Sequence, residues 1–458
     1  AHVILVLFCA AVFAGCAGRP EKPGVPAEKP ESFSGSGSRK VPERWWTEFD
    51  DQKLDLLVQQ ALKGNLDLKT SWHRLKEARA AARRASSSLF PRAETSLEGR
   101  AESGPSGSSE ELTFGLMAEY EVDLWGGIGS EAEAERLRAE AGLEQYRAAA
   151  VTLSSEVALA WYRLAGACRR LELSENQAAA NKKMLSLVRT RFANGQSGRA
   201  DVLRQQQLAE SAREGVRAGE SEVRVLQNQL SVLLGKPPEK TPDCESCSLP
   251  SLPPLPDTGV PSGLIGRRPD VREARMRLMA AGMDFAASEI SRYPRLAITA
   301  SASSSDTDAS DPFDDWLRSL AANLTLPLID GGRRKAEADM AEAVKNQRLY
   351  EYGQAVLEAF REVEDALVRE EKQKKRVNLL EKQAELAQNA ADQLKRQYLN
   401  GDGNYLDVLS AVTEKQQTDR DLVSAEQELV EYRIGLYRAL AGGFETKRQP
   451  GGSREKKD

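Results

Sequence analysis

One pattern of residues occurs twice along the 458-residue chain, and this internal repeat limits the possible fold more than any other feature. Residues in the first half recur in the same order 203 to 206 positions later. The matched pairs are Asp67 with Asp270, Arg74 with Arg277, Leu75 with Leu278, Ala78 with Ala281, Pro91 with Pro294, Arg92 with Arg295, Tyr146 with Tyr350, Asn194 with Asn400, Gly195 with Gly401, and Asp201 with Asp407. We therefore predict two tandem copies of one unit, over 45–235 and 263–443, joined by a Pro-rich segment over 236–262.

Each copy is predicted to begin with a helix, over 52–88 in the first copy and 268–291 in the second. A proline follows each helix, Pro91 in one case and Pro294 in the other. Because proline cannot continue a helix and favours an extended backbone in the residue before it, these prolines mark helix-to-strand junctions.

Alternating apolar and polar residues follow each junction and predict one β-hairpin per copy. The strands are expected over 93–100 and 112–124, and over 296–302 and 320–328. The apolar positions of the stronger strands are Leu112, Phe114, Leu116, Ala118, Tyr120, Val122 and Leu124, and Leu320, Ala322, Leu324, Leu326 and Leu328. Such strands are typical of membrane β-barrels, although the same alternation suits an antiparallel sheet packed on a soluble core. Four strands cannot close a barrel, so membrane strands would require several chains.

A Gly-Gly pair and a long proline-free helical stretch follow each predicted hairpin, over about 130–193 and 334–399. At 1.5 Å per residue, such a helix is about 96 Å long. Apolar residues at seven-residue steps in the first stretch predict a left-handed coiled coil. They are Leu143, Ala150, Val157, Leu164, Leu171, Ala178, Leu185 and Phe192. Each stretch ends at Asn-Gly and returns as a shorter helix, over 199–234 or 405–441, which makes two helical hairpins.

The two ends of the chain are predicted to lie outside the folded repeats. Residues 1–15 read as a signal peptide, because the apolar run from Val3 to Phe13 is too short to span a bilayer as a helix. Small residues precede Cys16 as in a lipoprotein signal, and an unlipidated signal with an incidental cysteine is the alternative. Residues 16–44 are rich in Pro and Ser and predict a lipidated flexible tether, and 444–458 predict a disordered tail.

Composition excludes two broad classes of protein. The formal charge of −5 lacks the basic surplus expected of a nucleic-acid binder. A mean hydropathy of −0.51 excludes a bundle of transmembrane helices.

Other residues with possible chemistry are few, and we expect no enzyme activity, no cofactor and no metal. The sequence has no nucleophile elbow, P-loop or dinucleotide loop, and His73 stands among basic residues on a predicted helix. Cys244 and Cys247 lack the second ligand pair of a zinc site and are expected to form a local disulfide. Cys168 continues an apolar helical stripe and is expected to be a core residue.

Several motifs together resemble the TolC-like outer-membrane efflux proteins, within them the lipoprotein channels of RND-type multidrug pumps, and the resemblance covers nearly all of 45–443. The motifs are Trp45, Trp46 and Phe49, then Tyr120 to Gly127, Arg268 to Val271, Asp330 to Gly332, and Ala359 to Leu367. The resemblance implies an α+β membrane protein with mainly long helices. It implies a homotrimer whose twelve-stranded β-barrel continues as a periplasmic α-helical tunnel. The implied role is a passive exit duct, energised by an inner-membrane RND-type transporter through a periplasmic adaptor (membrane fusion) protein.

The resemblance also implies a gate at the helical tips. By motif position, Asp201 and Tyr398 would form a latch, and Asp407 an acidic ring of three by symmetry. The turn residues implied to dock the adaptor are Asn194, Gly195, Gly198, Asn400, Gly401 and Gly403. Gly403 stands where a latch arginine can occur, and Ser410 where a second ring aspartate can occur, which implies a looser and less cation-binding closed state. Alternatively, the two aspartates only cap the returning helices.

Two readings without a pore stay open, a periplasmic adaptor and a coiled-coil envelope lipoprotein. An adaptor with one helical hairpin would not produce the duplicated order of elements. A coiled-coil lipoprotein would lack the two alternating strand pairs. The lipoprotein-like start favours efflux over protein secretion, and the transported substrate, which the pump selects, is not readable from this chain.

Overall fold

The computed structural model of the chain describes residues 24–26, 28, 30–105, 107–238, 248–306, 316–444 and 446. The chain divides into two compact units, which we describe in turn. The first comprises Ala1–Glu28, Trp72–Gln145 and Asp270–Val356, and the second comprises Lys29–Ser71, Tyr146–Pro269 and Leu357–Asp458. The predictions of a signal peptide, of a lipid on Cys16 and of a disulfide between Cys244 and Cys247 fall outside the described residues.

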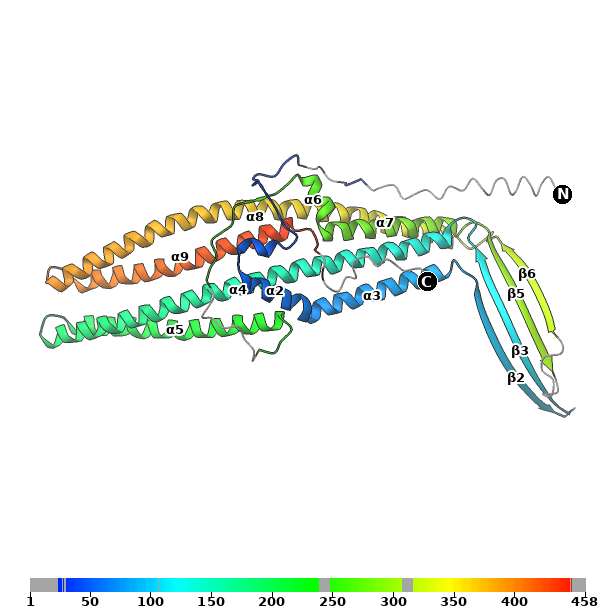
Figure 1. Cartoon of the computed structure of the whole chain (residues 1–458), viewed down its shortest axis with the longest axis horizontal. Helices are drawn as coiled ribbons and strands as arrows, with labels where there is room; N and C mark the ends of the chain where they lie inside the picture. Colours follow the sequence, from blue (N-terminus) through cyan, green and yellow to red (C-terminus); the bar gives the residue numbers. More distant parts are fainter. Residues whose placement is uncertain are drawn as a thin grey trace. The chain divides into compact units, whose positions relative to one another are not determined.

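The first unit contains a four-stranded antiparallel sheet in the order β2-β3-β5-β6 (Figure 1). Its strands are β2 (Arg92–Gly104), β3 (Gly107–Val122), β5 (Arg295–Asp306) and β6 (Trp316–Thr325). Both predicted hairpins are confirmed, and pairing of β3 with β5 joins them into one sheet. The prediction that the last strand reaches residue 328 is wrong, because Pro327 has no N–H to donate to a ladder.

The helix predicted over 52–88 is two helices, α2 (Gln52–Gly64) and α3 (Leu66–Ser87). The break lies at Asn65, whose ψ of 132° is extended. Its side-chain oxygen accepts the N–H of Leu68 at 2.9 Å, and its amide donates to the carbonyl of Leu233 at 3.1 Å. A capping side chain anchored to another helix therefore ends one helix and begins the next. In the second copy, α7 (Pro269–Ile290) matches the predicted helix closely.

Four long helices form the two predicted helical hairpins. The first hairpin is α4 (Gly127–Ala193) with α5 (Arg199–Leu233), and the second is α8 (Arg333–Asn400) with α9 (Tyr405–Leu440). All eight ends lie within three residues of the predicted ones. Among the described residues, none of the helices has the length and apolar character needed to cross a membrane.

The seven-residue stripe predicted on α4 is only partly its buried face. Val157 and Leu164 are fully buried, as expected. Toward the end of α4, however, Phe192 is 45% exposed, whereas Gln177 and Asn181 are buried. The strict heptad prediction is therefore wrong in this part of the helix, where the buried face runs through Gln177, Asn181 and Val188 rather than through the predicted positions.

An aromatic cluster fixes the segment before α2 in the second unit. The short helix η1 (Trp45–Phe49) places Trp45 on Tyr437, with ring centroids 5.7 Å apart, and Trp46 on Phe444 at 5.1 Å. These rings are all nearly or fully buried. The prediction that the tail from 444 is disordered is therefore wrong for Phe444.

The predicted flexible tether over 16–44 is also wrong in its described C-terminal part. Phe33 packs against Phe360 with centroids 6.3 Å apart, and the N–H of Ser34 donates to Glu364 at 2.8 Å. Strand β1 (Arg39–Lys40) then pairs in parallel with β4 (Pro256–Asp257). A segment that composition alone marks as a linker is thus ordered by contacts with residues far along the chain.

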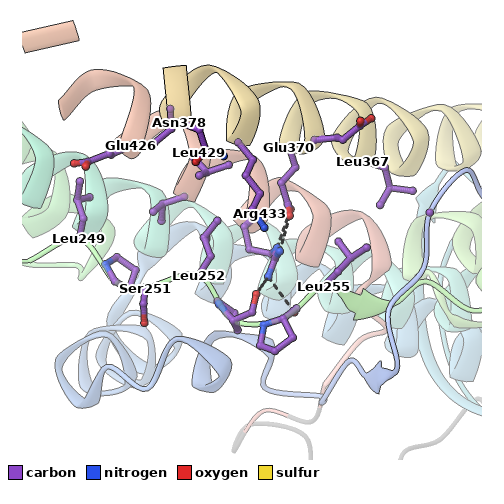
Figure 2. A pocket seen from close by; sticks show the side chains of 18 of the residues that line it. Leu249, Ser251, Leu252, Leu255, Leu367, Glu370, Asn378, Glu426, Leu429 and Arg433 are labelled. Atoms are coloured by element: carbon purple, nitrogen blue, oxygen red, sulfur yellow. Dashed lines mark hydrogen bonds and ion pairs between the residues drawn. The ribbon is translucent and has the colours of Figure 1, made fainter. Parts of the chain in front are cut away.

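The Pro-rich inter-repeat segment is held by a buried ion pair. Arg433 of α9 donates to Glu370 of α8 through Nε at 2.8 Å and also donates to the carbonyls of Pro253 and Pro254 (Figure 2). Leucines of this segment line a groove of about 970 Å³ beside α8 and α9. The chain then enters the short helix α6 (Pro261–Arg267).

Cys168 of α4 is a further correction. It was expected to be a core residue, but it is only half-buried and is disulfide-bonded.

Replacing Arg433 by Met should destabilise the second unit by about 3–5 kcal/mol, because Glu370 would stay buried without its partner. The residues from 248 to 257 should also become sensitive to protease. Arg376→Met is the matched control, since the Arg376–Glu428 pair is about half exposed and should contribute less than about 1 kcal/mol. Thermal unfolding of the two variants checks this, and equal melting temperatures would contradict it.

Candidate functional site

The sheet of the first unit has one apolar and one polar face, set by its register. On β3 and β5, Leu116 pairs with Ala302 and Tyr120 with Ile298, whereas Thr113 pairs with Ser305. The apolar face also carries Leu97, Phe114, Leu296, Leu320 and Leu324, and the other carries Glu94, Glu98, Glu119, Thr299, Ser301, Ser319 and Asn323. An exposed apolar face of this extent marks a surface that contacts something other than water in the functioning protein. The alternation therefore suits a sheet with lipid on one side.

The two outer strands of this sheet are unpaired on one side within the described residues. Strand β2 pairs only with β3, and β6 only with β5. Their free N–H and C=O groups would be unsatisfied in hydrocarbon. The sheet is therefore incomplete as a membrane element in a single chain.

Aromatic rings gather where helices of this unit meet the strands. Trp125, after β3, lies 5.3 Å from Tyr293, after α7, and its indole N–H donates to the carbonyl of Pro294 at 2.8 Å. Both rings are about half exposed. Phe90, at the equivalent junction of the first copy, is also largely exposed. Amphipathic rings at this position are typical of the boundary between membrane and water.

Arginine placed on the two faces of β6 should distinguish lipid from water. Leu320→Arg puts a charge on the apolar face at a residue that is 78% exposed, and it should reduce insertion stability by about 2–4 kcal/mol if that face meets the bilayer centre. Ser319→Arg, one residue away on the polar face, should be tolerated. Yield of folded protein in liposomes and resistance to heat in detergent measure the difference. Equal tolerance would exclude lipid from this face.

The second unit holds both helical tips, and each long helix ends in the same turn. The N–H of Gln196 donates to Arg191 at 2.8 Å after Gly195, and the N–H of Asp402 donates to Gln397 at 3.0 Å after Gly401. The two glycines have φ of 71° and 92°, which L side chains rarely adopt. The expected role of these glycines in tight turns is confirmed. Asn194 and Asn400, which precede them, are exposed.

The two gate aspartates behave differently in the structure. Asp201 caps α5, since its carboxylate accepts the N–H of Gly198 at 3.2 Å and the hydroxyl of Ser197 at 3.1 Å. Asp407 is exposed, and the cap of α9 is instead Asn404, whose side chain accepts from Leu406 at 3.0 Å. The alternative reading of both aspartates as caps is therefore right for Asp201 and wrong for Asp407.

Tyr398 is buried in the tip and does not bond to Asp201. Its side chain is 4% exposed, the guanidinium of Arg191 lies 4.6 Å from its ring centre, and within the described residues its hydroxyl has no hydrogen-bond partner. Arg191 also donates to the carbonyl of Leu399 at 3.3 Å. In this structure, the latch implied between Tyr398 and Asp201 is therefore not closed within the chain.

A small apolar core joins all four helices at the tip. Its buried members are Val188, Tyr398, Tyr405 and Val408, and around them pack Met184, Val202, Leu394, Leu409 and Val412. The hydroxyl of Tyr405 donates to the side-chain oxygen of Gln205 on α5. Burial raises the pKa of Tyr405, so this donor keeps its proton. Sequence reasoning missed Tyr405 and Gln205, because neither belongs to a repeated pair.

Gly403 lies against the end of α8 in the turn before α9. A Cβ added there would lie 2.9 Å from the backbone nitrogen of Tyr398. The absence of a side chain at this position is thus a packing requirement, and an arginine would not fit here without a shift of the turn.

Among the described residues, no three His, Cys, Asp or Glu side chains gather as metal ligands would.

Gly403→Ala should loosen the tip, because the new methyl group meets backbone atoms that cannot rotate away. We expect a loss of about 1–3 kcal/mol, as for other overpacked positions. Gly198→Ala is the control, since its Cβ would approach nothing closer than 3.6 Å. Hydrogen exchange of the amides over 394–412 should rise in the first variant alone. Unchanged exchange would show that the turn adapts.

A sheet with one apolar face and open edges, combined with two long helical hairpins, is the pattern expected of a membrane channel protein with a helical tunnel. The family described as outer membrane efflux protein matches residues 57–236 and 260–442. The chain therefore belongs to the outer membrane efflux protein family.

Known members and solved structures cover almost the whole chain. Cation efflux system protein CusC of Escherichia coli O6:H1 is 27% identical over 458 residues, which covers 96% of this chain and 99% of CusC. Probable outer membrane lipoprotein SilC of Salmonella typhimurium is 26% identical over 453 residues, with coverage of 94% and 97%. The structure of the outer-membrane channel OprN matches with a TM-score of 0.86 and 27% identity, over 93% of this chain and 99% of that one. The chain is an outer-membrane efflux channel protein.

Proposed function

We propose that three copies of this chain form the exit duct of a tripartite efflux pump. The observation that carries the proposal is the four-stranded sheet with a lipid-compatible face and two unpaired edges, β2 and β6. In a bilayer each edge must find a partner, and pairing of β6 with β2 of the next copy satisfies both. Three such sheets give twelve strands, an even number within the range of known barrels.

The helical tips are the proposed contact for the other two components of the pump. A periplasmic adaptor would dock on the turns at 194–198 and 400–403, and an inner-membrane RND-type transporter would supply the energy. Support comes from the exposure of Asn194, Gly195, Asn400 and Gly401. CusC, to which the chain is similar, is a protein of a cation efflux system, which is consistent with a multicomponent pump.

The same tips are the proposed gate. Tyr398 would act through its ring, which completes the tip core, and Asp201 through its cap, which fixes where α5 begins. Asp407 is exposed beside the turn and would form a ring of three carboxylates in a trimer. Lipidation at Cys16 completes the proposal and is supported by the description of SilC as a probable lipoprotein.

The test is the mass of the detergent-solubilised protein together with its conductance in a planar bilayer. We expect a trimer with a small conductance that rises when Tyr398→Ala opens a cavity in the tip core. Tyr398→Phe keeps the ring and should conduct as the parent does.

A monomer without conductance would contradict the proposed trimeric duct. A conducting trimer that Tyr398→Ala leaves unchanged would keep the duct but move the gate away from the tips.

A further inference from the structure

Buried side chains with amide or hydroxyl groups connect the two helical hairpins just behind the tip. Four of them are almost inaccessible: Gln205 and Asn181 are each 2% exposed, Tyr405 is 2% exposed and Gln416 is 7% exposed. Gln205 and Asn181 belong to the first hairpin, and Tyr405 and Gln416 belong to the second. Polar groups so deeply buried destabilise a structure unless each has a partner.

Their hydrogen bonds form one connected path across the hairpins. Tyr405 donates to Gln205, which in turn donates to the backbone carbonyl of Asn181 at 3.0 Å. The amides of Asn181 and Gln416 then bond to each other in both directions, at 3.4 and 3.3 Å. Gln177 donates to the carbonyl of Gln416 at 3.2 Å, so the path continues along α4 and α9.

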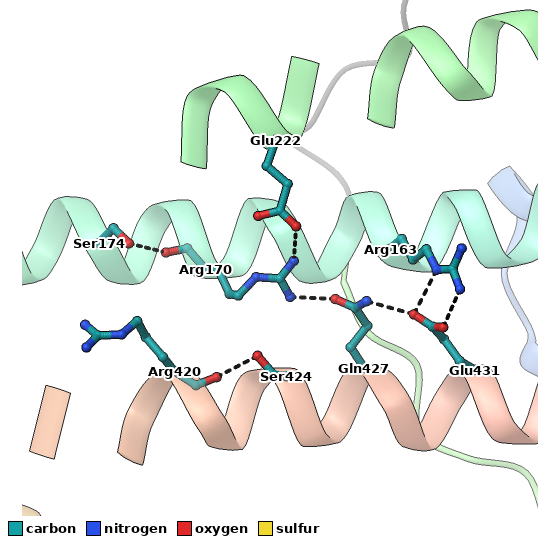
Figure 3. Close-up of polar contacts among 8 residues, drawn as sticks. All are labelled: Arg163, Arg170, Ser174, Glu222, Arg420, Ser424, Gln427 and Glu431. Atoms are coloured by element: carbon teal, nitrogen blue, oxygen red, sulfur yellow. Dashed lines mark hydrogen bonds and ion pairs between the residues drawn. The ribbon is translucent and has the colours of Figure 1, made fainter. Parts of the chain in front are cut away.

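Further from the tip, the same two helices stay joined by charged groups. Arg170 of α4 reaches Glu222 of α5 and Gln427 of α9, at 2.6 Å in each case, and Arg163 binds Glu431 through two bonds (Figure 3). These groups are more exposed than the four at the tip. Separation of α4 from α9 here would expose these charges to water and would cost little free energy. Near the tip it would leave buried amides unpaired or require water to enter.

We propose that Tyr405, Gln205, Asn181 and Gln416 form a hydrogen-bonded clasp that holds the two hairpins of one chain together and sets the closed state of the gate. The inference rests on the proposed function of the tips. The clasp takes the place of the contact between Tyr398 and Asp201 as the main connection between the two hairpins of one chain. Because buried hydrogen bonds of this kind form together or break together, the clasp gives the tip two discrete states rather than a continuous range of arrangements.

Two tyrosines of the same tip core provide a matched test. Tyr405→Phe removes one hydroxyl and leaves the buried oxygen of Gln205 without its donor, whereas Tyr398→Phe removes a hydroxyl that has no partner within the described residues. Both variants keep the ring, and the two side chains are buried to nearly the same degree. We expect Tyr405→Phe to raise the population of separated hairpins about tenfold, as one unsatisfied buried group would, and Tyr398→Phe to leave it unchanged.

Two measurements on the full-length protein in detergent and in bilayers decide the matter. Hydrogen exchange over 199–208 and 405–416 should be faster in Tyr405→Phe alone, and conductance should rise in the same variant alone. Equal exchange in both variants would overturn the clasp. Faster exchange in Tyr405→Phe from a protein that never conducts would keep the clasp and overturn the duct.

A second pair of variants covers the amide bond between the hairpins. Gln416→Leu alone leaves Asn181 unpaired and should behave as Tyr405→Phe does. The double variant Asn181→Leu with Gln416→Leu removes both polar partners and should restore slow exchange through apolar packing. If the increase in hydrogen exchange of the double variant equals the increases of the two single variants added together, the two amides are not coupled.

Discussion

A strand edge with free N–H and C=O groups cannot remain in hydrocarbon, and this constraint determines how the rest of the molecule must be used. The sheet β2-β3-β5-β6 has such an edge at each end and an apolar face that water would not cover. In a membrane, a four-stranded sheet with open edges can only be a portion of a larger barrel. The proposed trimer gives twelve strands, which lies within the range of known barrel sizes.

The gate proposed in the second unit makes a different physical demand, because a duct that closes must have a part with two stable arrangements. The apolar core at the tip would by itself favour one compact state. The buried path from Tyr405 through Gln205 and Asn181 to Gln416 adds contacts that are satisfied together or lost together. A tip built from both elements can be firmly closed and still open as a unit, which a purely apolar seam would resist.

Much of the fold was predictable, because the patterns that carry it are local. Alternation of apolar residues predicted the strands, and prolines and Asn-Gly turns predicted where helices end to within three residues. The failures have identifiable causes. Asn65 ends a helix because its side chain is anchored to Leu233, far away in the sequence. The segment after Phe33 is ordered by Phe360 and by a two-residue strand pairing, neither of which composition records.

The sequence by itself determined the duplication, the two-faced strands, the helical hairpins and the glycine turns, since each follows from backbone geometry over a few residues. Only the tertiary structure decided which side chains meet at the tip. Tyr405 finds Gln205, and Tyr398 and Asp201 do not bond to each other, because partners 200 residues apart depend on the register between helices. That register is set where the side chains of the two hairpins pack together at the tip, and no short motif contains it.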